Sequence, residues 1–182
     1  MNFTEKTIKR QEIFRGKVIS VHVDEVELKN GNKSSREVVE HMGGVCVAAI
    51  TQEKEILFVE QYRYPYSKSI LELPAGKLEV GQTPLENGIR ELKEEVGAIG
   101  KNYTFLGELY PSPGYCGEVI YMYYCFIEEI GDCCPDEDEF LNVVKIPLST
   151  AVEMVFSNEI FDAKTQVVIL KLHVLNSLGK LF

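Results

Sequence analysis

The sequence predicts an α/β (α+β) fold in which a mixed β-sheet lies between helices. Strand-like alternation dominates the first half of the chain, one strongly capped helix follows, and a second group of strands precedes two further helical segments. This order of elements is typical of a sheet that is covered by helices. The 182 residues are enough to form a core that folds alone.

The expected strands are segments in which apolar and polar side chains alternate, or short apolar runs, with turn residues between them. They lie at 17–28, 35–40, 45–50, 56–61, 69–73, 105–110, 119–127 and 140–146. Residues 29–32 form the first turn, and the strands at 45–50 and 56–61 are expected to pair as a hairpin. The strand at 69–73 leads into a predicted turn at residues 74–76.

The helix expected after that turn has signals at both ends. Thr83, Pro84 and Glu86 predict a capping box with proline at the first helical position, and Gly97 follows the last turn. An apolar stripe at helical spacing is expected to pack on the core, with the acidic side chains opposite: Leu85, Ile89, Leu92 and Val96. Gly88 is unusual in this helix, because an interior glycine costs about 1 kcal/mol relative to alanine.

Two helices are expected at the end of the chain, at residues 149–158 and 163–178. Asp162 is the predicted N-cap of the second helix, and Gly179 is its predicted stop. Together with the capped helix, these segments complete a layered arrangement around the sheet.

Three carboxylates, Glu91, Glu94 and Glu95, lie within five residues of the capped helix. At about 100° per residue they fall within about 100° of arc, where like charges repel. A divalent cation among them would remove this repulsion, and Mg²⁺ prefers carboxylate and water oxygens and is often shared with substrate phosphates. The cluster therefore predicts a magnesium-dependent enzyme that acts on a phosphate compound, with a solvated acidic face as the alternative.

Charge and cysteine content exclude several classes of partner. The formal net charge is −9 and no cluster of Lys and Arg is visible, which argues against nucleic acid or an anionic membrane as a partner. The sequence contains no apparent signal peptide and no apolar run of membrane-spanning length. The five cysteines lack a paired CxxC zinc pattern. We therefore expect free thiols and a cytoplasmic location.

The spacing of residues around this helix resembles the box of the Nudix hydrolase family. The matching residues are Gly76, Arg90, Glu91, Leu92, Glu94, Glu95 and Gly97. Two positions depart from the pattern, because Gln82 stands where the family has glutamate and Ala98 where it has a larger aliphatic residue. The glutamate in relatives braces the loop and contacts the arginine, so a weaker brace is expected at Gln82. The resemblance implies a Nudix α/β/α sandwich with an added N-terminal strand region.

Residues beyond the box resemble the ADP-ribose pyrophosphatase branch of this family. Pro113 lies 15 residues past the last box position, the spacing that marks this branch, and the similarity extends over roughly residues 15–175. It implies hydrolysis of the diphosphate of ADP-ribose to AMP and ribose 5-phosphate. The alternatives are a pyrophosphatase for another nucleoside-diphosphate sugar or dinucleotide, and a non-catalytic ADP-ribose sensor.

The same resemblance implies the metal site and the catalytic groups. Glu91, Glu95 and the carbonyl of Ala75 are the expected ligands of Mg²⁺, with Mn²⁺ as the alternative ion. Glu94 lies on the same face and is expected to hold a further metal ion or a water. The general base is expected in the acidic loop at 136–139, with Glu137 as the leading candidate and Glu139 as a metal-facing carboxylate. These last two roles are interchangeable.

Substrate-binding residues are also implied by the resemblance. They are Val18, Ile19, Arg36, Arg63, Lys77, Ser112, Pro113, Gly114 and Glu118. Arg63 resembles the arginine that contacts the diphosphate, which suits a bidentate guanidinium, and Arg36 is placed near the adenosine. An ordinary surface salt bridge is the alternative for both arginines. Val18 and Ile19 lie where relatives contact adenine, and residues 112–114 with Glu118 are expected to shape the ribose pocket.

The branch is expected to be a homodimer. Residues 1–43 form the expected N-terminal β region, through which strands are exchanged between subunits, and residues 44–182 form the Nudix domain. The alternation at 17–28 fits this exchange and equally fits a strand that pairs within one chain.

Overall fold

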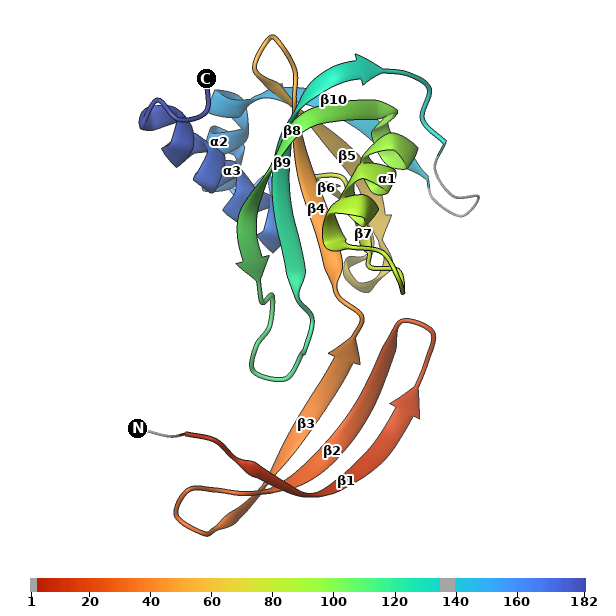
Figure 1. Cartoon of the computed structure of the whole chain (residues 1–182), viewed down its shortest axis with the longest axis vertical. Coiled ribbons are helices and arrows are strands. Elements are labelled where there is room, and N and C mark those ends of the chain that lie inside the picture. Colours follow the sequence, from red (N-terminus) through yellow and green to blue (C-terminus); the bar gives the residue numbers. More distant parts are fainter. Residues whose placement is uncertain (1–2, 135–139) are drawn as a thin grey trace. The chain divides into compact units, whose positions relative to one another are not determined.

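The computed structural model describes residues 3–134 and 140–182. It divides the chain into two compact units (Figure 1). The first unit comprises the chain up to Gly43 together with residues 110–119, and the second comprises residues 44–109 and 120–182. Each unit is a sheet-based structure with its own pattern of stabilising contacts.

The first unit is a three-stranded antiparallel sheet in the order β1-β2-β3. Its strands are β1 (Lys6–Arg15), β2 (Ile19–Glu27) and β3 (Lys33–His41). The 110–119 segment joins this sheet, because the N–H of Val39 donates to the carbonyl of Tyr115 at 2.8 Å and the N–H of Gly117 donates to the carbonyl of Val39 at 2.9 Å. This loop therefore folds with β3, although it lies about 70 residues further along the chain.

Charged side chains fasten one face of this sheet. Arg10 donates two hydrogen bonds of 3.0 Å to the buried Asp24 and one of 3.1 Å to Glu40. The buried ring of His22 lies between the same two acids, at 3.0 Å from Asp24 and 3.1 Å from Glu40. Polar contacts therefore link all three strands on this face.

The second unit contains a seven-stranded mixed sheet in the order β10-β5-β4-β9-β8, with β6 beside β5 and β7 beside β4. Strands β4 and β9 are parallel, and the other paired strands of this sheet are antiparallel in the described residues. The strands are β4 (Gly44–Ile50), β5 (Glu55–Arg63), β6 (Lys68–Glu72), β7 (Ala75–Lys77), β8 (Ala98–Leu109), β9 (Ile120–Ile130) and β10 (Leu141–Pro147). The helices are α1 (Pro84–Val96), α2 (Leu148–Phe156) and α3 (Ala163–Ser177), with a 3₁₀ turn at Tyr64–Tyr66.

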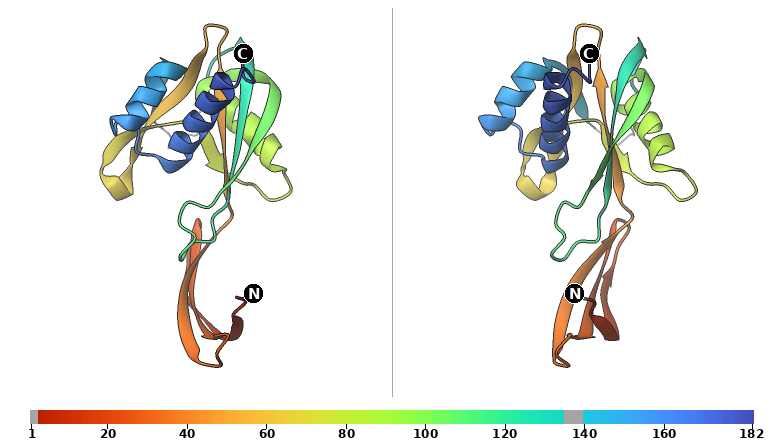
Figure 2. Two further views of the ribbon diagram at one scale, coloured as in Figure 1. Left: turned by 90° about the vertical axis from the view of Figure 1, so that its left-hand side faces the viewer. Right: turned by 60° about the vertical axis from the view of Figure 1, so that its left-hand side comes forward.

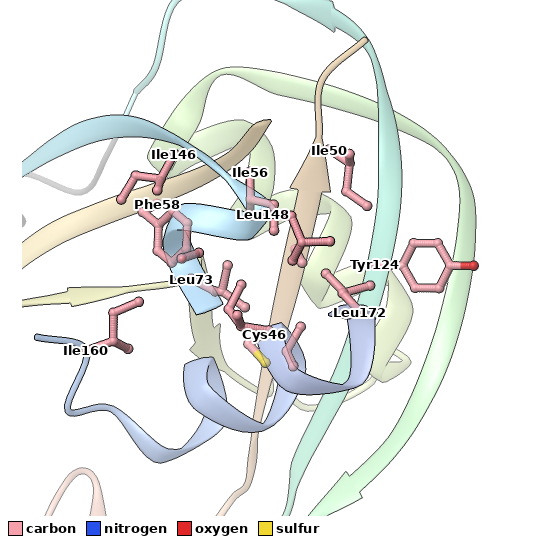
Figure 3. Packing of buried hydrophobic residues seen from close by; sticks show 14 of the residues in the cluster. Cys46, Ile50, Ile56, Phe58, Leu73, Tyr124, Ile146, Leu148, Ile160 and Leu172 are labelled. Atoms are coloured by element: carbon pink, nitrogen blue, oxygen red, sulfur yellow. The ribbon is translucent and has the colours of Figure 1, made fainter. Parts of the chain in front are cut away.

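Helices cover both faces of this sheet, with α1 on one side and α2 and α3 on the other (Figure 2). The alternation of side chains along β4 explains the two layers. Cys46, Ala48 and Ile50 belong to the core beneath α2 and α3, and Val45 and Val47 belong to the core beneath α1. Figure 3 shows the larger core, which surrounds fully buried side chains such as Phe58. Each such side chain stabilises the fold by about 1.5–3 kcal/mol. The predicted α/β/α sandwich is therefore confirmed.

Two local details differ from the sequence prediction, and the predicted hairpin is confirmed. Strands β4 and β5 pair antiparallel at Ile50 and Ile56, and β4 then runs beside β7 and β9. Strand β1 was not expected, since all ten of its residues are exposed and it is held by pairing with β2 rather than by burial. Residues 75–77 form strand β7 rather than a turn, because they pair with residues 44–46 of β4.

Helix α1 begins and ends where its caps predict. The side chain of Thr83 accepts a hydrogen bond from the N–H of Glu86, the carboxylate of Glu86 accepts one from the N–H of Thr83, and Gly97 adopts the left-handed conformation with φ of 65°. The buried face differs from the predicted stripe. Ile89 is 42% exposed, while Gly88 and Glu95 are buried against the sheet.

The reason lies in how closely α1 approaches β4. A Cβ on Gly88 would lie 2.9 Å from Cγ2 of Val47 and 3.1 Å from Cγ2 of Val45. Gly88 is therefore the point at which the helix contacts β4 most closely. Ile89 lies about 100° further round the helix and is turned toward solvent. The cost of an interior glycine is offset by this close contact between helix and sheet.

All five cysteines are free thiols, as expected. Cys46 and Cys125 are buried, which raises the pKa of each thiol to about 12 and keeps both protonated at neutral pH. Cys133 and Cys134 are exposed. Within the described part of the chain, no helix is both long enough and apolar enough to span a membrane.

Candidate active site

Two carboxylates of α1 lie against two consecutive residues of β7, Ala75 and Gly76. A Cβ on Gly76 would lie 1.8 Å from Oε1 of Glu91, so this carboxylate rests directly against the glycine backbone. Oε2 of Glu95 accepts a hydrogen bond of 3.0 Å from the N–H of Ala75. Strand β7 and helix α1, which are linked by the loop at 78–83, therefore bring the expected metal ligands Glu91, Glu95 and Ala75 to one place.

This donor set suits a hard divalent cation. Glu95 is only 2% exposed, and burying a carboxylate is costly unless positive charge or hydrogen bonds compensate for it. Carboxylate and main-chain carbonyl oxygens are the ligands that Mg²⁺ and Mn²⁺ accept. Among residues 3–134 and 140–182, no group of three His, Cys, Asp or Glu side chains is arranged to hold a metal ion. The fit consequently depends on two carboxylates and a backbone carbonyl.

Arg90 holds two of the acids in place. Its guanidinium donates to Glu91 at 2.8 Å and to Glu94 at 2.6 Å, and it also lies 3.3 Å from Glu79. Burial acts to lower the pKa of Arg90, but the charges of the three glutamates outweigh it and leave the pKa above its usual value. Glu94 is thus brought into the cluster through Arg90, and the repulsion among the acids is reduced.

Glu79 supplies the brace that the departure at Gln82 was expected to weaken. One oxygen of Glu79 faces Arg90, and the other accepts a hydrogen bond of 2.8 Å from the amide of Gln82. The N–H of Glu79 also donates to the side chain of Asn87 at 3.0 Å, which ties the loop to α1. Gln82 therefore acts as a donor to Glu79, rather than as an acceptor for Arg90.

Arg63 lies at the end of β5 and is bound to a buried acid. Its Nε and Nη2 donate to the two oxygens of Glu72 at 2.6 and 2.9 Å. The side chain of Glu72 is 2% exposed, whereas that of Arg63 is 38% exposed. The hydrogen bonds to Glu72 raise the pKa of Arg63 above its usual value, and the charge of Glu95 adds a smaller contribution in the same direction. The candidate diphosphate-binding guanidinium thus lies within electrostatic range of one candidate metal ligand.

Lys164 is a charged residue near this site to which sequence reasoning gave no role. Its ammonium group contacts Glu72 and lies 3.0 Å from Asp162, and the Lys164 side chain is 11% exposed. Burial acts to raise the pKa of Glu72, but hydrogen bonds and charges from Arg63 and Lys164 outweigh it and leave the pKa below its usual value. The available sequence signal was an acid at position 72 between two leucines in a predicted strand.

The remaining candidate residues fall in three groups. Lys77 is exposed at the end of β7 in the second unit. Glu137 and Glu139 lie outside the described residues. The candidates of the first unit are Val18, Ile19, Arg36, Ser112, Pro113, Gly114 and Glu118.

Within the first unit, two of these candidates have polar side-chain partners. Arg36 donates to Glu5 at 2.9 and 2.6 Å, the salt bridge that was its alternative interpretation. A carboxylate oxygen of Glu118 lies 3.4 Å from Nδ1 of His41. Val18 and Ile19 are 48% and 37% exposed, which leaves apolar surface open to contact.

Comparison with known proteins finds two matching family models and a solved structure with the same fold. Residues 40–165 match the model of the NUDIX domain, and residues 5–39 match that of the nucleoside diphosphate sugar hydrolase N-terminal domain. A crystal structure of an ADP compounds hydrolase superimposes with a TM-score of 0.84 over 99% of both chains, at 20% identity, which supports the fold.

Three curated relatives extend the similarity. The chain is 44% identical to ADP-ribose pyrophosphatase of Bacillus subtilis (strain 168), over 88% of each chain. It is 43% identical to the methanol dehydrogenase activator of Bacillus methanolicus, over 92% of this chain and 91% of that one. It is 30% identical to ADP-ribose pyrophosphatase of Mycobacterium tuberculosis, over 94% of this chain and 84% of that one. The chain therefore belongs to the Nudix hydrolase family and is a homologue of ADP-ribose pyrophosphatases.

Proposed function

We propose that this protein hydrolyses the diphosphate of ADP-ribose to AMP and ribose 5-phosphate and requires Mg²⁺, with Mn²⁺ as an alternative ion. The observation that carries the proposal is that Glu91 lies against Gly76 while Glu95 accepts a hydrogen bond from the N–H of Ala75. Two acidic side chains directed at one backbone segment suit a cation that is shared with substrate phosphates. The curated names of two relatives support ADP-ribose as the substrate.

Each group has a proposed task in the reaction. Water adds to one phosphorus, the bond from that phosphorus to the bridging oxygen breaks, and the proton of the water passes to Glu137. When bound, Mg²⁺ supplies positive charge to the diphosphate oxygens and favours ionisation of a water. Glu91, Glu95 and the carbonyl of Ala75 would hold the cation, Glu94 would hold a further ion or a water, and Glu139 would be a metal-facing carboxylate. Arg63 binds the diphosphate through a guanidinium edge.

Residues of the first unit are proposed to recognise the two ends of the substrate. Arg36, Val18 and Ile19 bind the adenosine part, and residues 112–114 with Glu118 shape the ribose pocket. Support comes from the match of residues 5–39 to the N-terminal domain model of nucleoside diphosphate sugar hydrolases. Lys77 is proposed to assist at the phosphates, because an exposed cation attracts the substrate's negative charge.

The protein is further proposed to be a cytoplasmic homodimer with exchanged N-terminal strands. All ten residues of β1 are exposed, including Ile8, Ile13 and Phe14, which supports a partner for this edge of the sheet. The exposed thiols of Cys133 and Cys134 support a reducing compartment.

The decisive experiment measures AMP release from ADP-ribose with Mg²⁺, beside a panel of nucleoside-diphosphate sugars and dinucleotides. Wild type, Glu95→Gln and Glu86→Gln are compared. Glu86 lies on the same helix, and glutamine can still serve the capping box, so this variant controls for the loss of a carboxylate alone. We expect the wild type and Glu86→Gln to prefer ADP-ribose, and Glu95→Gln to lose at least about a hundredfold in rate.

Other outcomes would change the proposal. Faster turnover of another panel member would keep the reaction and replace the substrate. Tight ADP-ribose binding without turnover, with or without added metal, would mean that the protein is a non-catalytic ADP-ribose sensor.

Strand exchange has its own test. If each active site uses both chains, mixed dimers of Glu95→Gln and Arg36→Ala regain part of the wild-type activity, since one of their two sites is intact. Light scattering that gives a monomer mass, or mixtures no more active than their components, would overturn it.

A further inference from the structure

The start of helix α3 carries a compact group of polar residues that are buried beside the candidate active site. Lys164 contacts Glu72 and Asp162, and the exposed fractions of these three side chains are 11%, 2% and 17%. Charges that are buried this deeply are costly to desolvate and are often no more stabilising than apolar residues of similar size. Stability alone therefore gives little reason for this arrangement.

One branch of the group leads to Arg63. Glu72 contacts Lys164 through Oε2 and receives both Nε and Nη2 of Arg63. The third guanidinium nitrogen, Nη1, has no hydrogen-bond partner among the described residues. The guanidinium is thus clamped along one edge, and another edge is left to bind an anion.

A second branch leads to the metal-ligand segment. Oγ1 of Thr165 accepts a hydrogen bond of 2.9 Å from the N–H of Leu73 and donates one of 2.6 Å to Asp162. Leu73 precedes Ala75 by two residues, and the N–H of Ala75 donates to Glu95. The first turn of α3 therefore holds both Arg63 and the chain segment that supplies a candidate metal ligand.

We propose that Lys164 is a positioning residue for the substrate diphosphate, because it fixes Glu72 and thereby the orientation of the Arg63 guanidinium. This inference rests on the proposed role of Arg63 in substrate binding. The ammonium group balances part of the charge of Glu72, so that Arg63 is held without losing all of its attraction for phosphate. Lys164 itself does not contact the substrate in this arrangement.

The informative variant is Lys164→Met, which keeps an unbranched side chain one heavy atom shorter and removes its charge. Glu72 would then turn its carboxylate toward Arg63 alone, and the guanidinium would follow. We expect KM for ADP-ribose to rise roughly tenfold, the effect of losing one hydrogen bond to a charged group. The kcat and its dependence on Mg²⁺ concentration should change less than about threefold.

Lys171→Met is the matched control. Lys171 lies on the same helix, and its ammonium group donates to the carbonyl of Leu106 at 2.6 Å, so the same substitution also removes one hydrogen bond. Thermal unfolding is recorded for both variants, and kinetics are measured well below the lower Tm. A change in KM for Lys164→Met alone separates positioning from a general loss of stability.

A double-mutant cycle with Arg63→Ala tests the route of the effect. If Lys164 acts through Arg63, adding Lys164→Met to Arg63→Ala leaves KM within about twofold of the Arg63→Ala value. Equal effects of Lys164→Met in both backgrounds would overturn the proposal, as would a KM equal to that of Lys171→Met. If Lys164→Met fails to fold, the weaker variant Lys164→Gln takes its place in the same cycle.

Binding of ADP by calorimetry separates this inference from the proposed function. If the wild type binds ADP but does not hydrolyse ADP-ribose, the proposed hydrolase activity is overturned. The double-mutant cycle can then still be evaluated from the Kd values for ADP. Hydrolysis by wild type with an additive cycle would overturn the positioning role alone. Wild type that neither binds ADP nor hydrolyses ADP-ribose would overturn both.

Discussion

The carboxylate of Glu91 lies so close to Gly76 that a Cβ on the glycine would fall 1.8 Å from Oε1 and 2.0 Å from Cδ of that side chain. No side chain can be accommodated at position 76 while Glu91 keeps its position. Glycine is therefore required here for space, because the backbone and a carboxylate share one small volume. The requirement connects a position in strand β7 to a candidate metal ligand in helix α1.

Gly76→Ala is expected to displace Glu91 and to lower kcat by about a hundredfold, since small misplacements of reacting groups have effects of this size. Overpacking should also reduce the free energy of unfolding by about 1–3 kcal/mol. Gly131→Ala is the control, because the nearest atom to its Cβ would be 3.9 Å away. Steady-state kinetics and denaturant unfolding check both effects, and a Gly76→Ala enzyme with wild-type kcat would contradict this account.

The Glu72→Gln substitution is expected to make the free energy of unfolding depend less on pH in the acidic range. Because the pKa of Glu72 is held below its usual value in the folded state, its contribution is complete above the ordinary glutamate pKa of about 4.3 and is lost as pH falls through the lower, folded value. Removing one partner of a buried ion pair costs about 3–5 kcal/mol at neutral pH.

Urea unfolding of wild type and Glu72→Gln between pH 7 and pH 3 measures this dependence. The difference in unfolding free energy between the two should shrink as the pH drops below about 4. A difference that stays constant, or that grows on acidification, would show that the ionised form of Glu72 is not the stabilising one.

Gln82→Glu, which restores the residue of the family pattern, is expected to bring no gain in activity. The amide of Gln82 donates to Glu79, and a glutamate in its place would put two carboxylates against each other. The reciprocal swap, Glu79→Gln together with Gln82→Glu, should remove this repulsion between carboxylates, because one donor and one carboxylate again face each other near Arg90.

The effect of Gln82→Glu on the free energy of unfolding should stay below about 1 kcal/mol and weaken in high salt, as for exposed charges generally. Thermal unfolding at low and high ionic strength provides the measurement. A single Gln82→Glu variant that is more stable or more active than wild type would exclude Glu79 as the brace.

Gly88→Ala is expected to destabilise the protein, although alanine is the better helix former. The added Cβ would lie 2.9 Å from Cγ2 of Val47, and overpacking of this kind costs about 1–3 kcal/mol, more than the gain of about 1 kcal/mol in helix propensity. Val47→Ala removes the opposing methyl groups, so the double variant should be more stable than the sum of the two single changes predicts. Additive effects in denaturant unfolding would mean that Gly88 and Val47 do not contact.

Features with a local cause could be predicted from the sequence. The limits of α1 follow from Thr83 and Gly97, which act within one turn of the chain. The candidate metal ligands Glu91 and Glu95 could be placed on one helix face because they lie four positions apart in the sequence. The two-layered core follows from alternation along β4, which needs no knowledge of distant residues.

Features with a distant cause could not be predicted in this way. Ile89 has the right spacing for a core position, yet Gly88 sets the contact with β4. Lys164 meets Glu72 across 92 residues, and neither sequence neighbourhood contains its partner. Strand β1 contains few apolar residues in alternation, and only its pairing with β2 shows that it is a strand. In each case the deciding contact belongs to the tertiary structure.

The 110–119 segment leaves and re-enters the second unit but folds with the first. Its backbone is bound to Val39, and Glu118 lies beside His41. A gene shortened to begin at residue 44 would therefore leave this loop without the strand that shapes it. Likewise, a chimaera that takes its first 43 residues from a relative has to take residues 110–119 from the same source, because these two stretches form one module for recombination.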